Sequence, residues 1–188
     1  MTHKGADRDA RPVGGAATAS AIPPVEAWLD VARSMPDLDV DLAAVATTLR
    51  FQRAADGLFG AFEEFFAGYD LSDGRFTLLM ILLMKPPDWL DPTPSELAER
   101  VGVSRATITS LLDGLERAHL VARAAHPTDR RRLVVRLTED GRALMARLLP
   151  DYFRHVGTVA DHLDDAERQQ LDRLLSKLYL GIPRARQP

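Results

Sequence analysis

The chain has 188 residues, 46% of them hydrophobic and 27% charged, which is enough for one well-packed domain and ordinary for a folded protein. It has no cysteine, which excludes disulfide bonds and thiolate metal sites, and its net charge of −3 gives no overall attraction to nucleic acid. Its longest apolar run, residues 78–84, is too short to span a bilayer, and its N-terminus lacks a secretion signal, so we expect a cytoplasmic protein without a membrane partner.

The first third of the chain is predicted to hold a tail and two helices. Residues 1–22 are rich in alanine, glycine and threonine without an apolar period, which is typical of a disordered tail. A proline pair ends this tail, and residues 23–37 contain a short extra helix with Trp28 among its apolar positions. A long helix follows over residues 41–68, and its excess of phenylalanine and alanine indicates a surface that faces a partner.

Three further helix starts are indicated by residues that cap a helix N-terminus. Ser72 is the first, Thr93 with Glu96 three residues later forms a capping box, and Ser104 is the third. The helix from Thr93 is short and ends near Gly102, so a tight turn separates it from the helix that Ser104 caps. This order is typical of a helix-turn-helix, whose second helix enters the major groove of DNA.

The helix after Ser104 is predicted to present a polar face to DNA, because its leucine and isoleucine residues fall on one stripe. The candidate DNA contacts are Ser104, Arg105, Ala106, Thr107, Thr109, Ser110 and Arg117. The small hydroxyl and methyl side chains among them allow a close approach to base edges, and Arg105 could reach a guanine or a phosphate. Asp113 lies on the same face, so it must either accept a hydrogen bond from a cytosine amino group or pair with Arg117.

Two short strands, residues 120–125 and 133–137, are predicted to form a hairpin. Its tip carries three candidate DNA contacts: Arg130, Arg131 and Arg132. Residues 100–136 hold eight arginines and three acidic residues, a net charge of +5, which leaves −8 for the rest of the chain. Arginines on a thin ribbon suit the narrow minor groove, and directly behind a helix-turn-helix we prefer this to a solvent-exposed basic turn.

The last quarter of the chain is predicted to form two helices. Thr138 starts the first, and we expect Pro150 to kink or restart it. A second capping box at Asp164 opens a final helix over residues 164–180, and residues 183–188 are expected to be flexible. The predicted fold class is therefore mainly α with a small β-hairpin wing (α+β).

Several stretches of this pattern together resemble the MarR family of winged-helix regulators. They are Ser95-Glu96-Leu97-Ala98, Val103-Ser104-Arg105-Ala106-Thr107-Ile108-Thr109, Leu120-Val121-Ala122-Arg123, Asp129-Arg130-Arg131 and Leu137-Thr138-Glu139-Asp140-Gly141. The resemblance covers residues 40–181, and the last two stretches are its most specific part. His119 departs from it, because the family usually has glycine between the second helix and the wing.

The resemblance implies a homodimer that binds double-stranded DNA at a pseudo-palindromic site. Residues 38–71 and 139–182 would form the helical dimerisation region, in agreement with their surplus of apolar side chains, and residues 72–138 the DNA-binding lobe. In this family the wing aspartate commonly pairs with a nearby arginine to keep the hairpin rigid. By position this role falls to Asp129, which leaves the arginines that follow it to enter the groove.

The extra helix with Trp28 resembles the urate-responsive branch of the same family. Trp28 and Arg123 match the ligand residues of that branch, but Thr77 stands in place of an aspartate and Leu111 in place of an arginine. We therefore do not predict urate, and expect a different ligand or none. Our ligand candidates are Trp28, Arg75, Thr77 and Arg123, which would suit a small aromatic or anionic molecule.

Two weaker patterns could indicate other chemistry. His155 and His162 could share a helical face, but no further metal ligands accompany them at suitable spacing. Ser104, His126 and Asp129 are the residue types of a hydrolase triad, but a strained nucleophile turn and a glycine-rich oxyanion loop are both missing. We therefore expect no metal, no cofactor and no catalysis.

The sequence thus predicts a DNA-binding transcription regulator, a repressor that a small ligand releases from its operator by shifting the population of DNA-competent dimers. A ligand-independent regulator that acts by occupancy is the main alternative. A small dimeric enzyme is a remote one.

Overall fold

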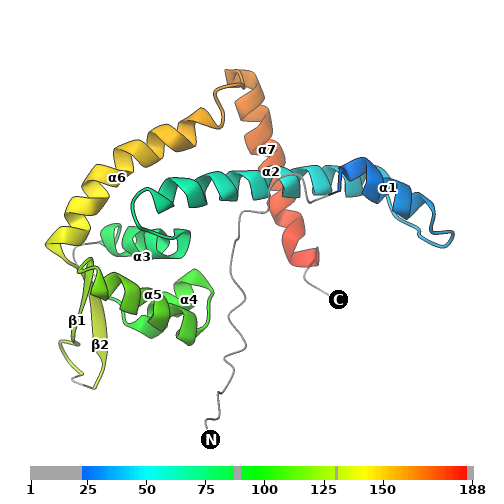
Figure 1. The fold of residues 1–188 in the computed structure, drawn as a ribbon. Coiled ribbons are helices and arrows are strands. Elements are labelled where there is room, and N and C mark those ends of the chain that lie inside the picture. The colour runs from blue at the N-terminus through cyan, green and yellow to red at the C-terminus, as the bar shows by residue number, and fades with distance from the viewer. Residues whose placement is uncertain (1–22, 87–89, 130, 186–188) are drawn as a thin grey trace, which may run out of the picture. The chain divides into compact units, whose positions relative to one another are not determined.

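The computed structural model of the protein describes residues 23–86, 90–129 and 131–185. Over these residues it contains seven α-helices and one two-stranded antiparallel sheet, divided between two units, Met1–Gly68 and Tyr69–Pro188 (Figure 1). This confirms the predicted class of a mainly helical fold with a small β-hairpin. The predicted tail of residues 1–22 lies outside the described residues.

The first unit consists of α1 (Val25–Arg33) and α2 (Leu42–Ala67), which pack against each other. Their shared core contains Val25 and Leu29 from α1 and Ala46 from α2. Asp41 caps α2 by accepting hydrogen bonds from two backbone N–H groups of its first turn. The extra N-terminal helix is therefore present where the apolar spacing predicted it.

The second unit begins with the winged lobe. It comprises α3 (Asp73–Leu83), α4 (Pro94–Val101), α5 (Arg105–Arg117), β1 (Val121–Ala125) and β2 (Leu133–Leu137). Ser72 and Ser104 cap α3 and α5, and Thr93 forms a complete capping box at the start of α4. All three predicted helix starts are confirmed, because each rests on a hydrogen bond within four residues of sequence.

Every element of this lobe contributes to its core. The fully buried side chains are Leu78, Leu79, Leu97, Ile108, Leu112, Leu115, Val134 and Val135, with Met145 and Leu148 from the following helix, and Val121 of β1 is 2% exposed. Burying an aliphatic side chain of this size contributes about 1.5–3 kcal/mol. The hairpin is also fastened at its edge, where the N–H of Val135 donates to the carbonyl of Pro92 at 2.8 Å. The lobe is therefore a firm support for its surface residues.

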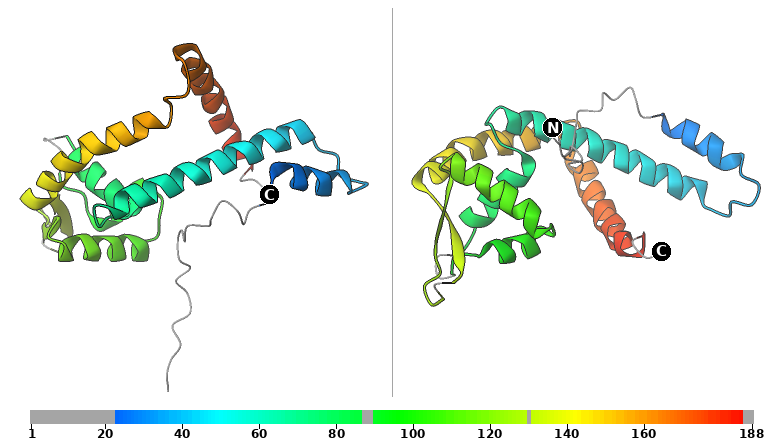
Figure 2. Two further views of the ribbon diagram at one scale, coloured as in Figure 1. Left: turned by 45° about the horizontal axis from the view of Figure 1, so that its top comes forward. Right: turned by 60° about the horizontal axis from the view of Figure 1, so that its bottom comes forward.

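The hairpin pairs Val121 with Leu137 and Ala125 with Leu133, so β1 and β2 are in register along their full length. Figures 1 and 2 show the hairpin extending beyond α4 and α5, with its tip away from the rest of the lobe. A wing that projects in this way can reach a surface that α5 also reaches.

The turn between α5 and β1 is closed by His119 in a left-handed conformation, with φ of +57°. The N–H of His119 donates to the carbonyl of Glu116, and the N–H of Leu120 donates to that of Leu115, both at 2.9 Å. This is the Schellman arrangement, in which the left-handed position usually holds glycine. His119 therefore adopts the left-handed conformation that glycine usually adopts at this position of the motif.

Two helices complete the second unit, α6 (Glu139–Thr158) and α7 (Asp165–Ala185). Thr138 caps α6, and Asp164 and Glu167 form the predicted capping box of α7. Gly141 is needed where α6 begins, because a Cβ there would lie 2.2 Å from the carbonyl oxygen of Leu120. The glycine of the Leu-Thr-x-x-Gly motif thus permits the hairpin and α6 to approach closely.

Two details of these last helices differ from the prediction. Pro150, which was expected to kink or restart its helix, lies inside α6 without restarting it. The final helix extends beyond residue 180 to Ala185, so residues 183–185 of the expected flexible end are helical, and residues 186–188 lie outside the described residues. Across the described chain, none of the helices is both long and apolar enough to cross a bilayer.

Candidate nucleic-acid interface

A tight turn joins α4 to α5 and sets the direction of α5. Gly102 has a left-handed φ of +73° and donates its N–H to the carbonyl of Ala98 at 2.9 Å. Glycine tolerates this conformation without steric cost. Two residues later, the Ser104 hydroxyl accepts a hydrogen bond from the N–H of Thr107 at 3.1 Å and starts α5. The predicted helix-turn-helix is therefore present.

The polar side chains of α5 lie on the face that the helical wheel predicted. Ile108, Leu112 and Leu115 are fully buried on the opposite side. The exposed residues are Ser104, Arg105, Ala106, Thr107, Thr109, Ser110, Asp113 and Arg117. Every candidate contact on this helix is therefore accessible, and their contact with DNA stays a prediction.

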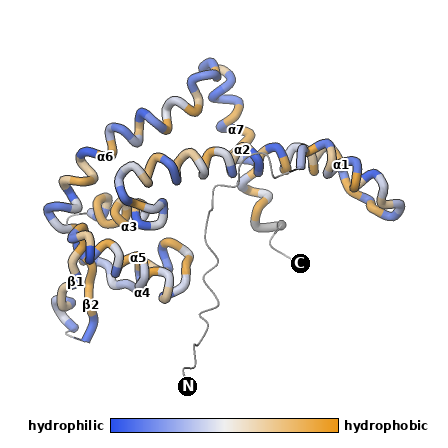
Figure 3. The backbone as a smooth tube through the Cα atoms, viewed as in Figure 1, coloured by the Kyte–Doolittle hydropathy of each residue, from blue (hydrophilic) through white to orange (hydrophobic). Residues whose placement is uncertain are grey.

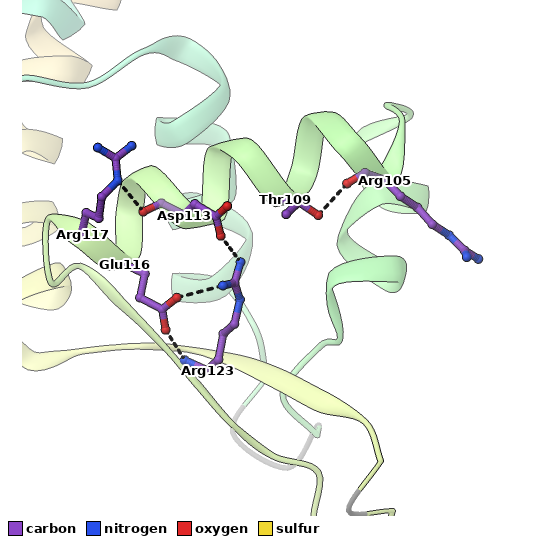
Figure 4. A network of polar contacts seen from close by, with 6 residues as sticks. All are labelled: Arg105, Thr109, Asp113, Glu116, Arg117 and Arg123. Atoms are coloured by element: carbon purple, nitrogen blue, oxygen red, sulfur yellow. Dashed lines mark hydrogen bonds and ion pairs between the residues drawn. The ribbon is translucent and has the colours of Figure 1, made fainter.

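Some of these side chains already have partners within the helix. The hydroxyls of Ser104 and Thr107 lie 2.8 Å apart, and the Thr109 hydroxyl donates to the carbonyl of Arg105 at 2.9 Å. Figure 4 shows the guanidinium of Arg105 extending away from the helix. Arg105 thus carries its positive charge beyond the surface of α5.

Asp113 pairs with Arg123 of β1, at 2.6 Å between Oδ1 and Nη2, and not with Arg117 (Figure 4). The Nε of Arg117 instead donates to the backbone carbonyl of Asp113 at 3.3 Å. Arg123 also binds Glu116, at 2.9 Å between Nη1 and Oε2. The predicted pair of Asp113 with Arg117 is therefore wrong, because the hairpin brings a second guanidinium to the same carboxylate.

The wing tip is held by backbone hydrogen bonds around Asp129. The Asp129 carboxylate accepts a hydrogen bond from the N–H of Arg131 at 3.0 Å. The backbone carbonyl of Asp129 accepts a second hydrogen bond, from the N–H of Arg132, at 2.9 Å. In the described residues Asp129 therefore orders the tip through the main chain, and its expected pairing with an arginine side chain is not among the contacts seen. Arg130 lies outside the described residues.

The two described arginines of the tip differ in their surroundings. The side chain of Arg131 is exposed, whereas the Nη2 of Arg132 pairs with Oε1 of Glu96 on α4 at 3.0 Å. The other oxygen of Glu96 accepts the N–H of Thr93 in the capping box at 2.8 Å. One carboxylate thus caps α4 and also fastens the tip of the wing, and of the two described arginines Arg131 is the better placed to enter a groove.

The four ligand candidates are divided between the two units. Trp28 lies on α1 with 52% of its surface exposed, beside a small cavity of about 90 Å³ that Arg53 and Asp56 also line. Arg75, Thr77 and Arg123 belong to the second unit, where Arg123 is bound to the two acidic residues of α5. The guanidinium of Arg75 covers Gly114, since a Cβ there would lie 2.3 Å from Nη2.

The weaker patterns for other chemistry find no support in the geometry. The Ser104 hydroxyl is used as a helix cap, and the Nδ1 of His126 lies 3.3 Å from the N–H of Thr128 within its own turn. Over the part of the chain that the structure describes, no three histidine or acidic side chains are grouped to hold a metal ion.

Known proteins resemble this chain both in sequence and in fold. The sequence profile of the MarR family matches residues 69–132. The HTH-type transcriptional repressor YetL of Bacillus subtilis is 39% identical over 117 residues, which cover 62% of this chain and 69% of YetL. The chain belongs to the MarR family.

Solved structures of similar proteins agree with this MarR assignment. The repressor CouR bound to a 23-mer DNA duplex has a TM-score of 0.62 and 25% identity, covering 76% of this chain and 99% of CouR. BpsR of Bordetella bronchiseptica, described as regulated in its DNA binding by 6-hydroxynicotinic acid, has a TM-score of 0.58 and 24% identity over 71% of this chain and 98% of that one. This MarR-family chain is therefore a DNA-binding transcription regulator and not an enzyme.

Two residues of the interface were missed by sequence reasoning. Glu96 was read only as a capping residue, and Glu116 was not singled out. The available signal was that two of the three acidic residues in the arginine-rich segment, Asp113 and Glu116, are spaced to share one side of α5. That spacing predicts a shared basic partner but does not say which arginine supplies it.

Proposed function

We propose that this MarR-family regulator is a homodimeric repressor that acts in the cytoplasm on a pseudo-palindromic operator. Two copies of α5 enter successive major grooves, and two wings contact the flanking minor grooves. The observation that carries this proposal is that the exposed face of α5 and the exposed Arg131 of the wing lie on one firmly packed lobe. The name of YetL as a repressor supports the sign of regulation.

A dimer is supported by the apolar side chains that α6 and α7 leave uncovered. The exposed ones are Phe153, Val156, Val159, Leu171, Leu174, Leu175, Tyr179, Leu180 and Ile182. Figure 3 shows hydrophobic segments recurring between hydrophilic ones along α7. Exposed apolar surface of this extent usually marks an interface between proteins. A second copy of the chain related by a two-fold axis would bury it and place two lobes on one duplex.

A small aromatic or anionic ligand is proposed to release the DNA. BpsR, which has the same fold, is described as controlled by an aromatic acid. The candidate groups of this chain are the indole of Trp28 in the first unit and, in the second unit, Thr77 and the guanidinium of Arg75, while Arg123 is already paired with two carboxylates. A ligand acts only through its difference in affinity between the two dimer states.

The DNA-binding proposal is tested by replacing the exposed wing arginine. We expect Arg131→Ala to weaken binding to a duplex selected by the wild-type protein by about 1–3 kcal/mol, measured by fluorescence anisotropy. Arg33→Ala is the matched control, because Arg33 is also exposed but pairs with Asp30 within α1. Equal affinities of the wild type and Arg131→Ala would contradict insertion of the wing.

The ligand proposal is tested by thermal melting in a series of aromatic carboxylates that includes 6-hydroxynicotinic acid. A true effector raises the melting temperature by mass action and lowers DNA affinity over the same concentration range. Arg75→Ala should remove both responses. A series without either response would favour the ligand-independent regulator.

A further inference from the structure

Arg123 connects the wing to the C-terminal half of α5 through three contacts. Its Nη2 binds Asp113 at 2.6 Å, and its Nη1 binds Glu116 at 2.9 Å. Its backbone N–H also donates to the other oxygen of Glu116 at 3.3 Å. Glu116 therefore accepts hydrogen bonds from both the side chain and the main chain of Arg123. These two contacts fix the position of the Arg123 guanidinium (Figure 4).

The guanidinium of Arg123 is poorly placed to bind a phosphate itself. The side chain retains only 25% of its exposure, and both of its terminal nitrogens already have carboxylate partners. Asp113 is more open, with 49% of its side chain exposed, and it lies on the face of α5 that carries Arg105 and Thr109. An unneutralised carboxylate on that face would repel the phosphates of a bound duplex.

We propose that Arg123 is a positioning residue for DNA recognition, which neutralises Asp113 on the DNA-facing side of α5 and is itself anchored by Glu116. This inference rests on the proposed use of α5 for DNA binding. It assigns to Arg123 a role within the protein, in which it strengthens DNA binding without touching the DNA.

The proposal makes a specific demand on the pair of residues. Removing Arg123 exposes the charge of Asp113 to the duplex, so DNA affinity falls. Removing the charge of Asp113 as well takes away the cause of that loss, so affinity returns. An arginine that contacts the DNA directly would show no such dependence on Asp113.

The test is a double-mutant cycle on the 188-residue chain, using a duplex selected from a random-sequence pool by the wild-type protein. We expect Arg123→Ala to lower affinity about tenfold, which corresponds to about 1.4 kcal/mol. Asp113→Asn in the Arg123→Ala background should restore most of this loss, and in the wild-type background it should change affinity much less. Arg136→Ala is the matched control, because Arg136 is an ion-paired arginine of the same hairpin whose partner, Asp91, lies outside α5.

The salt dependence of binding separates the proposed role from a direct contact. The slope of log affinity against log salt concentration should be the same for the wild type and the double variant, because no phosphate contact is lost. A slope that falls by about 1 whenever Arg123 is absent would indicate a direct phosphate contact and overturn the proposal. An Arg123→Ala loss that Asp113→Asn does not restore would also overturn it.

A measurement without DNA keeps the proposal separate from the proposed function. In urea unfolding, the effects of Arg123→Ala and Asp113→Asn should be non-additive, because each variant removes the same ion pair. Additive effects would show that the pair does not form and would overturn the proposal. If the two substitutions are non-additive in unfolding but the wild-type protein selects no duplex, the ion pair exists and the proposed DNA-binding function of α5 is refuted.

Discussion

His119 has a left-handed conformation, with φ of +57°, which among the described residues other than glycine it shares with Asp70. A left-handed conformation costs a residue with a Cβ roughly 1–2 kcal/mol, and glycine avoids this cost but loses more chain entropy on folding. We expect His119→Gly to raise the free energy of unfolding by roughly 0.5 kcal/mol, measured in urea. His119→Val should lower it by about 1 kcal/mol or more, because β-branched side chains fit this region worst.

The control for His119 is its neighbour Ala118, which ends α5 with an ordinary right-handed φ of −82°. Ala118→Gly should only destabilise the protein, since no strain is relieved there. A His119→Gly variant that is destabilised as much as Ala118→Gly would show that the histidine side chain stabilises the turn and that the left-handed conformation costs little.

Single residues also show how far the sequence can be read. The helical wheel correctly placed Asp113 on the exposed face of α5, because exposure depends only on the 3.6-residue period. Its partner could not be predicted in this way. Arg123 reaches Asp113 because the Schellman turn and the hairpin register bring β1 back along α5, and that is a matter of tertiary structure.

At the scale of elements, Glu96 links two that are far apart in sequence, α4 and the wing. Its carboxylate accepts the N–H of Thr93 and pairs with Arg132, 36 residues away. The backbone N–H of Thr93 lowers the pKa of Glu96 most, the Thr93 side chain and Arg132 lower it further, and partial burial opposes them. Ionised Glu96 is therefore favoured in the folded state.

Two substitutions separate the capping role of Glu96 from its ion pair. Glu96→Gln keeps an oxygen for the N–H of Thr93 and loses the charge, so it should retain most of the stability. Glu96→Ala loses both contacts and should cost about 0.3–1.5 kcal/mol for the cap, measured by urea unfolding at pH 7. An equal loss in both variants would mean that the ion pair with Arg132 matters more than the cap.

The pH dependence follows from the lowered pKa of Glu96. The stabilisation is complete above the ordinary pKa of glutamate and is lost as the pH falls through the lower, folded-state value. Glu96→Gln should therefore reduce the loss of stability on the acidic side, while leaving the neutral range nearly unchanged. If the free energy of unfolding falls equally in the wild type and in Glu96→Gln as the pH is lowered, the Glu96 carboxylate does not contribute as proposed.

Element boundaries were predictable where a local signal sets them and unpredictable where packing does. Ser72, Thr93, Ser104, Thr138 and Asp164 each cap the helix that was predicted from them. Pro150 was expected to kink or restart its helix, but α6 continues through it without a restart. The end of α7 was also misjudged: Gly181 and Pro183 follow residue 180 and are ordinary signals for the end of a helix, but α7 continues through both to Ala185.

At the scale of the whole molecule, the account depends on two copies of the chain acting together. Each copy contributes one α5 and one wing, and the exposed apolar side chains of α6 and α7 are the surface proposed to join them. The sequence indicated part of this surface through the leucine residues of the final helix, and it also pointed to the phenylalanine-rich helix over residues 41–68. It could not give the spacing of the two lobes, which depends on how the helices of both copies pack.

The most direct measurement of this central claim is the affinity for operators in which the spacing between the two halves of a selected inverted repeat is changed. A rigid dimer reads half-sites about one helical turn apart, so inserting about five base pairs turns one half-site to the far side of the duplex. We predict that this insertion reduces selective binding to the level of a single half-site. Undiminished affinity after the insertion, or selection of a site without two-fold symmetry, would contradict the account.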